Sequence, residues 1–175
     1  MHRWRGRNIC GRITEVESYV GENDKASHAR FGKTMRNTVM YGGAGHSYVY
    51  LVYGMHNCLN IVTERAGFPA AVLIRGVVLV SARSYLTLPS PILGEGNLNG
   101  PGKLTRALRI TRALNNEDMV SSKKLYVVDD GYRIKKSQVL TSPRIGVDYA
   151  GEDALLPWRY YLSSPPLLSK ERRQR

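Results

Sequence analysis

Two carboxylates and a tyrosine in the stretch TEVESYV are spaced so that a strand would bring them together. Successive side chains of a strand point to opposite faces, so Glu15, Glu17 and Tyr19 would share one face. The other face would suit a protein core, and it would carry Thr14, Val16, Ser18 and Val20. The acidic face has two open interpretations: structural ion pairs with neighbouring arginines, or a catalytic carboxylate beside an aromatic ring.

Arg75 interrupts the apolar run AAVLIRGVVLV. An isolated buried charge is very costly, so this guanidinium must be paired or functional. Glu17 or Glu15 is the expected partner. A carboxylate, an arginine and a tyrosine in a basic chain are residue types that an active site acting on a polyanion could use.

Histidine and cysteine spacing does not indicate a metal site. His28 stands alone in KASHARFG, and a lone histidine is more often structural or exposed than a ligand. His46, His56 and Cys58 miss the paired spacing of structural zinc sites.

Charge points to a polyanionic partner. The chain of 175 residues carries 26 Lys and Arg against 14 Asp and Glu, a net charge of +12. A protein with such an excess of positive charge usually binds nucleic acid or an anionic membrane surface. The simpler alternative is a solvated basic surface with no partner. No long amphipathic basic helix or apolar span indicates a membrane, so nucleic acid is favoured. Two cysteines and no secretory signal indicate a reducing compartment.

The pattern of elements predicts one α+β domain over residues 1–175. Strands are expected over 11–20, 47–53, 57–63, 69–80, 123–130 and 132–140, mostly consecutive and therefore antiparallel. Gly54 falls between the second and third, which indicates a hairpin. Helices are expected over 23–31 and 100–110. Residues 1–10 are expected to be an irregular basic start, 87–100 a Pro/Gly-rich connector and 170–175 a basic tail.

Five segments in order carry a resemblance to a known family. They are GRITEVESYVGENDKASHARFGKTMRN, GHSYVYLVYGMHNCLNIV, AVLIRGV, GPGKLTRAL and RIGVDYAGEDALLPWRYY. From about Gly11 to Ser169 the chain resembles the alkyladenine (3-methyladenine, methylpurine) DNA glycosylases. The resemblance implies a single α+β domain with a curved antiparallel sheet, a protruding β-hairpin and flanking helices.

It also implies an activity. Such enzymes flip an alkylated or deaminated purine out of duplex DNA and hydrolyse its N-glycosidic bond with water. They leave an abasic site in base-excision repair, and the family uses no metal or cofactor. The expected substrates are of the 3-methyladenine, hypoxanthine and ethenoadenine type. The expected partner is double-stranded DNA holding a damaged purine, the expected state a monomer, and the expected location the cytoplasm near the nucleoid.

Site roles follow from the resemblance, position by position. Glu17 corresponds to the base that activates water, with Arg75 and the Ile145 carbonyl as further contacts to that water. The pocket for the flipped base corresponds to Tyr19, His28, Tyr50 and Asn60, where Asn60 excludes guanine. Contacts with DNA correspond to Tyr53 as the wedge, Met55 beside it, and Arg36 and Lys103 facing phosphates. Strand alternation separates Tyr50 from Tyr53 and leaves Tyr48 as ordinary sheet packing.

Family members carry a further helix and strand before the segment that matches here, so the resemblance implies a shortened N-terminus. An alternative function follows from it: a truncated, non-catalytic homologue that binds DNA or damage without turnover. A general basic RNA-binding module is a third reading, which the carboxylate beside Tyr19 and Arg75 disfavours.

Overall fold

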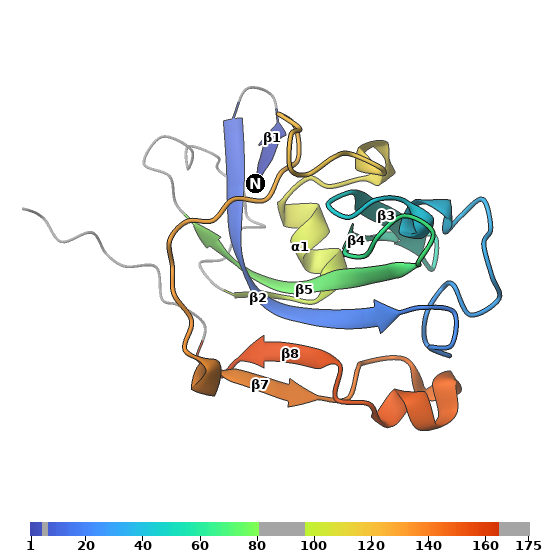
Figure 1. The fold of residues 1–175 in the computed structure, drawn as a ribbon. Coiled ribbons are helices and arrows are strands. Elements are labelled where there is room, and N and C mark those ends of the chain that lie inside the picture. Colours follow the sequence, from blue (N-terminus) through green and yellow to red (C-terminus); the bar gives the residue numbers. More distant parts are fainter. Residues whose placement is uncertain (5–6, 81–96, 165–175) are drawn as a thin grey trace, which may run out of the picture.

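A curved antiparallel sheet organises the protein, as a computed structural model shows for residues 1–4, 7–80 and 97–164 (Figure 1). Its centre is the long pair β2 (Arg7–Val20) and β5 (Ala70–Val80). The hairpin β3 (Ser47–Val52) and β4 (His56–Val62) extends one side, and β8 (Arg159–Leu162) and β7 (Val139–Ser142) extend the other. The strand order is β3-β4-β5-β2-β8-β7, while β1 (His2–Trp4) pairs with β2 and β6 (Asn97–Asn99) with β5.

The expected strands over 11–20, 47–53, 57–63 and 69–80 are confirmed, and so is the α+β class. Several expectations are corrected. Of the strand expected over 132–140, only residues 139 and 140 lie in a strand, β7, and residues 136–138 form a 3-10 helix. Residues 1–10 are not irregular, because β1 and the start of β2 lie there and form an antiparallel ribbon. Residues 123–130 form no strand, although Leu125 makes a single bridge to His2. Most of the expected 87–100 connector and all of the 170–175 tail lie outside the described residues.

The main core lies between the sheet and α1 (Pro101–Ala107). Leu104 and Leu108 of this helical segment are buried against Val49, Leu59 and Ile74 of the sheet. The Thr105 hydroxyl donates to the Asn57 carbonyl at 2.8 Å, which ties the helix to β4. In Figure 1, α1 lies over β5 beside the β3–β4 hairpin. The helix thereby contacts the hairpin close to its turn, at His56 and Asn57.

A β-bulge bends the central strand pair beside the acidic residues. The β2–β5 register shifts between Ile13 and Val16, opposite Gly76. A Cβ added to Gly76 would lie 2.9 Å from the Thr14 hydroxyl and 3.0 Å from the Glu15 Cβ, which is too close. Glycine is therefore required there, because the two backbones approach so closely at the bulge.

Residues 23–31, which were expected to be helical, form successive turns. Side chains take over the backbone donors: Asp24 accepts from the Val20 and Ala26 amides, and Ser27 accepts from the Ala29 amide. Such local side-chain bonds compete with helix formation. Short 3-10 helices complete the described chain, at Thr38–Tyr41, Arg112–Leu114, Lys136–Gln138 and Asp148–Leu155. Within the described ranges, no helix is long and apolar enough to span a membrane.

Candidate active site

Glu17 lies at the centre of the sheet with its side chain fully buried, at 0% exposure. Each carboxylate oxygen has one close donor: the Ile145 amide reaches Oε1 at 2.8 Å, and the Tyr19 hydroxyl reaches Oε2 at 2.8 Å. Arg75 lies against both oxygens, at 3.3 Å from each. These donors on both oxygens hold the buried carboxylate in a fixed orientation.

A second carboxylate and a second arginine extend this cluster. The Arg75 Nε donates to Glu15 Oε1 at 3.1 Å, and the Arg159 Nε donates to the same oxygen at 2.7 Å. Arg75 therefore pairs with both glutamates, as the interrupted apolar run indicated. Arg159 was not identified from the sequence; its place opposite Glu17 in the β2–β8 register brings it to Glu15. An arginine in a short aromatic strand was the only available signal.

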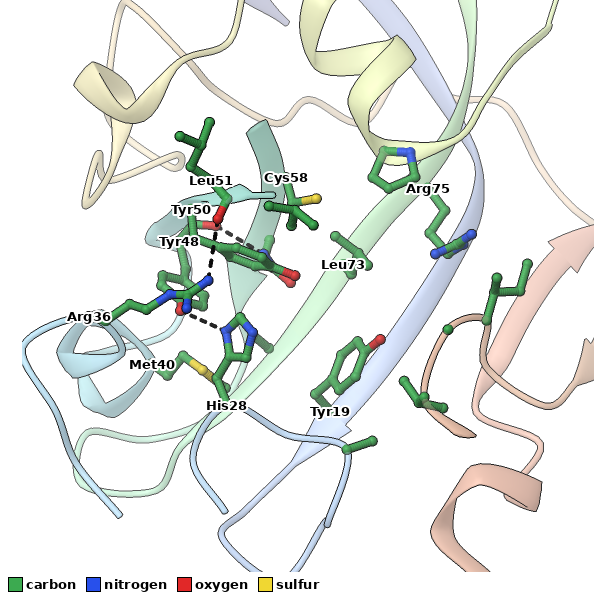
Figure 2. A pocket seen from close by; sticks show the side chains of 18 of the residues that line it. Tyr19, His28, Arg36, Met40, Tyr48, Tyr50, Leu51, Cys58, Leu73 and Arg75 are labelled. Carbon is green, nitrogen blue, oxygen red and sulfur yellow. Dashed lines mark hydrogen bonds between the residues drawn. The ribbon is translucent and has the colours of Figure 1, made fainter. Parts of the chain in front are cut away.

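A cavity of about 520 Å³ adjoins the cluster. Figure 2 shows Tyr19 on one side of it and His28 and Tyr50 on the other. These three side chains come from β2, from the turns that follow it, and from β3. The volume is in the range of small-molecule pockets, and facing aromatic rings suit a flat ligand. The described residues that line the cavity include Tyr19, His28, Arg36, Tyr48, Tyr50, Asn60, Leu73, Arg75, Ile145 and Tyr149.

His28 is held as a neutral imidazole on the cavity wall. Burial, with Arg36 and Arg30 nearby, lowers the pKa of His28 to about 4. Its Nδ1 and the Tyr48 hydroxyl form a hydrogen bond at 2.9 Å (Figure 2). The His28 ring also meets the Tyr50 ring edge-on, with centroids 4.4 Å apart.

Tyr48 packs in a buried core cluster on the sheet, as expected, and it has a second role as well. It is buried, yet it lines the cavity and orients His28 through its hydroxyl. Burial raises its pKa to about 12, so the phenol stays protonated and keeps its hydrogen bond. The alternation argument correctly placed Tyr48 on the face of Tyr50, and the partner His28 could not be seen from that pattern.

The floor and the far side of the cavity are polar at two points. Asn60 is buried and its Nδ2 donates to the Tyr48 carbonyl at 3.1 Å. Tyr19 meets the Glu17 cluster from the cavity side through its bond to Glu17. Burial, followed by the charge of Glu17, raises the pKa of Tyr19 well above its ordinary range. Tyr19 is therefore a neutral hydrogen-bond donor.

The hairpin tip presents its aromatic residue to solvent. Tyr53 is 88% exposed and Met55 is 71% exposed, in the turn between β3 and β4. Tyr53 has φ 50° and Gly54 has φ 69°, and the Met55 amide donates to the Val52 carbonyl at 3.0 Å. Positive φ at both central residues is the geometry of a type I′ hairpin turn, which favours Asn-Gly. A tyrosine is strained there, because positive φ is unfavourable for a bulky side chain.

Arg36 and Lys103 lie on either side of the hairpin. The exposed Arg36 donates to the Leu51 carbonyl at 3.3 Å, and its guanidinium lies 5.5 Å from the Tyr50 ring centre. Lys103, on α1, lines a second cavity of about 570 Å³ between the helix and the hairpin, with Arg106 and His56. Both basic residues therefore flank the rim of the hairpin rather than the Glu17 cluster.

Among the described residues, no group of three or more His, Cys, Asp and Glu side chains is arranged to hold a metal. Both cysteines are free thiols. The chemistry available at this site is that of a buried carboxylate, its arginine and an aromatic pocket.

Comparison with known proteins gives one family and many relatives. A family model described as methylpurine-DNA glycosylase matches residues 1–166. A protein of Methanocella arvoryzae is 53% identical over 164 residues, which span 93% of this chain and 80% of that protein. A protein of Desulfitobacterium hafniense is 45% identical over 181 residues, and one of Alkaliphilus oremlandii is 38% identical over 181 residues. These two alignments cover 97% and 98% of this chain, and 87% and 88% of those proteins. All three relatives bear the name "Putative 3-methyladenine DNA glycosylase".

Proposed function

The chain belongs to the methylpurine-DNA glycosylase family, and on that premise we propose that it releases damaged purines from duplex DNA by hydrolysis. The proposed substrates are 3-methyladenine, hypoxanthine and ethenoadenine type bases. The proposed reaction breaks the N-glycosidic bond with water and leaves an abasic site. The observation that carries the proposal is the fully buried Glu17, whose partners Tyr19, Arg75 and Ile145 line an aromatic cavity large enough for a base.

In the proposed reaction, binding begins when a purine base leaves the DNA double helix. Flipping a base costs a few kcal/mol, and least for a damaged one, which favours damaged over normal purines. A base in the cavity would stack between Tyr19 on one side and His28 and Tyr50 on the other. A purine nucleotide methylated at N3 carries a positive charge, and an electron-rich ring face attracts such a cation more strongly than it attracts a neutral base.

Glu17 is the proposed general base. Cleavage of a glycosidic bond passes through an oxocarbenium-like sugar, so an adjacent carboxylate both activates water and stabilises the positive charge. In Glu17, Oε1 lies against the Ile145 amide and Arg75 Nε, and Oε2 lies against the Tyr19 hydroxyl and Arg75 Nη1, so the attacking water must displace one of these donors. The Tyr19 hydroxyl is the donor that a side-chain rotation can remove, whereas the Ile145 amide is fixed in the backbone. Arg75 and the Ile145 carbonyl would then hold the water.

Asn60 is the proposed filter against normal guanine. It is buried in the cavity lining, and its amide is fixed by the Tyr48 carbonyl. A fixed amide cannot turn aside for the exocyclic 2-amino group of guanine. Hypoxanthine and adenine derivatives lack that group, so they would fit.

Tyr53 is the proposed wedge in the DNA stack, with Met55 beside it. Intercalated side chains of this kind offset part of the unstacking cost. Arg36 and Lys103 are proposed to contact phosphates on either side of the hairpin. If the +12 chain relies on phosphate contacts, its affinity for DNA falls steeply as salt concentration rises.

The test is a duplex that holds one hypoxanthine, incubated with the protein and then heated in alkali. We expect strand breaks at the lesion after alkali and an intact strand without it, because the enzyme is proposed to have no lyase activity. Glu17→Gln should abolish the breaks, whereas Glu64→Gln, at an exposed carboxylate, should keep them.

An absence of breaks in the wild type would overturn the proposed reaction. If the wild type then bound an ethenoadenine duplex more tightly than an undamaged one, the alternative of a non-catalytic damage-binding protein would stand.

A further inference from the structure

We propose that the buried ion pair of Asp24 and Arg144 is the positioning element of this site, holding Glu17 and two walls of the cavity in register. The inference rests on the proposed function, since it assigns a role in base release. It concerns two residues that the sequence analysis did not single out.

The pair itself is closed and bidentate. Arg144 Nη1 donates to Asp24 Oδ2 at 2.7 Å and Nη2 donates to Asp24 Oδ1 at 2.9 Å. Both side chains are 0% exposed. The two planar groups therefore fix each other's orientation, as a single-point contact would not.

Arg144 connects this ion pair to Glu17, the proposed general base. Its Nη1 also donates to the Ser18 carbonyl at 2.9 Å, in the strand between Glu17 and Tyr19. Its guanidinium lies 4.8 Å from the centre of the Tyr19 ring. The next residue in the chain, Ile145, donates its amide to Glu17 at 2.8 Å. A shift of Arg144 would therefore move the Ile145 amide, its carbonyl and the Tyr19 ring together.

Asp24 connects the pair to the opposite wall. Its two oxygens also accept from the Val20 amide at 3.2 Å and the Ala26 amide at 2.9 Å. These bonds shape the turn that follows β2 and leads to His28. Ala26 and His28 both line the cavity. One ion pair thus joins the wall that carries His28 to the segment that carries Ile145.

A contribution to folding stability does not by itself explain a buried ion pair at this position. Replacing a buried ion pair with apolar residues of similar volume is often neutral or stabilising, whereas removing one partner is strongly destabilising. Within the described chain, Arg144 Nε is buried without a hydrogen-bond partner, which is a further cost. The guanidinium carbon lies 4.8 Å from the centre of the Tyr19 ring and 5.0 Å from that of the Trp158 ring. What an apolar pair could not supply is the fixed geometry.

The experiment compares the double variant Asp24→Leu/Arg144→Met with wild type. Its matched control is Asp129→Leu/Arg133→Met, which removes an ion pair whose side chains are 72% and 80% exposed. The readouts are the thermal midpoint, the affinity for undamaged duplex and the single-turnover rate of hypoxanthine release. We expect the Asp24/Arg144 double variant to fold with a lower midpoint, because the Val20 and Ala26 amides and the Ser18 carbonyl lose their side-chain partners. It should keep its affinity for undamaged duplex. Its release rate should fall by about a hundredfold, the size expected for a misplacement of about 1 Å. The control should match wild type in all three.

Arg144→Lys covers the case in which the double variant does not fold. The lysine keeps the positive charge, so the variant should fold. It cannot donate to both Asp24 oxygens as the planar guanidinium does, so it should release hypoxanthine at least about tenfold more slowly. Amide exchange gives a readout that does not depend on activity. In Arg144→Lys the Ile145 amide should exchange about tenfold faster, while the Leu108 amide, which donates to the Leu104 carbonyl at 2.8 Å, should keep its rate.

A folded variant with the wild-type release rate, or one with unchanged exchange at Ile145, would overturn the positioning role. Equal acceleration at Ile145 and Leu108 would also overturn it, because that pattern marks a general loss of stability. If wild type itself released no base, the proposed function would fail, and the exchange comparison would still decide whether the pair holds Ile145 in place.

Discussion

Replacing Tyr53 with asparagine should separate stability from function at the hairpin tip. Tyr53 has φ 50° and precedes Gly54, so Tyr53→Asn creates the Asn-Gly pair that a type I′ turn favours. A left-handed conformation costs a residue other than glycine about 1–2 kcal/mol, and asparagine tolerates it better than a bulky aromatic residue. The substitution therefore removes part of a strain that the native turn contains.

The packing lost with the ring is small. Tyr53 is 88% exposed, so only about a tenth of its surface is covered. At about 25 cal/mol per Å², burial on the order of 20 Å² is worth roughly 0.5 kcal/mol. The net expectation is a gain of about 1 kcal/mol in the free energy of unfolding. In a protein of this size, that gain raises the thermal midpoint by roughly 2–4 °C.

The expected functional effect has the opposite sign. Stacking of a base on an aromatic side chain is worth about 1–3 kcal/mol, so removing the ring should weaken binding to the flipped state by roughly 5- to 150-fold. A duplex with one ethenoadenine reports this step, because its fluorescence rises when the base leaves the stack. Tyr53→Phe keeps both the ring and the strain, so it should resemble wild type in both measurements.

Two results would refute the reasoning in different places. A Tyr53→Asn variant that melts below wild type would show that the turn is not strained by tyrosine. A variant that melts higher but flips and releases the lesion like wild type would remove Tyr53 from the proposed role of wedge.

Four further substitutions probe the site and its frame. Asn60→Ala should admit guanine excision, measured as guanine release from undamaged duplex; unchanged selectivity would count against the filter. Tyr19→Phe should keep the release rate or raise it, because the ring stays and one acceptor position of the carboxylate is freed; a large loss of rate would show that the hydroxyl itself is needed. The pKa of His28 is about 4 in the folded protein and about 6.5 in the unfolded chain, so between these pH values the unfolded chain binds a proton more readily. The free energy of unfolding should therefore fall as pH drops from about 6.5 to 4. Between pH 7 and 4.5 wild type should lose roughly 2 kcal/mol more than His28→Gln in urea unfolding, and equal losses would contradict this burial effect. Gly76→Ala forces a Cβ to 2.9 Å from Thr14, so it should lower the free energy of unfolding by about 1–3 kcal/mol and slow base release; a wild-type melting curve would show that the bulge adapts freely.

Local alternation was enough to find the acidic face and the hairpin. Glu15, Glu17 and Tyr19 do share one face, and Arg75 does pair with both glutamates. These features depend on the two-residue period of a strand and on the cost of an unpaired buried charge, and both can be read from neighbours in the chain.

Contacts between segments far apart in the sequence could not be predicted from the alternation of side chains along one strand. Arg159 reaches Glu15 only because β8 pairs with β2 in one register, and the sequence does not state that register. The helix expected over 23–31 failed for a related reason. Asp24 is turned toward Arg144 and the local amides, so its side chain favours a turn at a place where composition alone permitted a helix.

The long separations within the site have a consequence for folding. Glu15 and Arg159 are 144 positions apart, Glu17 and Ile145 are 128 apart, and Asp24 and Arg144 are 120 apart. Each contact closes a long loop, whose entropy must be lost before the contact forms, so the topology favours slow folding. The β3–β4 hairpin joins residues close in sequence and can form early. Because domains are synthesised from the N-terminus, β8 docks on β2 after the aromatic walls already exist. We therefore expect a nascent chain to form the walls that carry Tyr19, His28 and Tyr50 first, and to complete the cavity and enclose Glu17 last, when the C-terminal segments are in place.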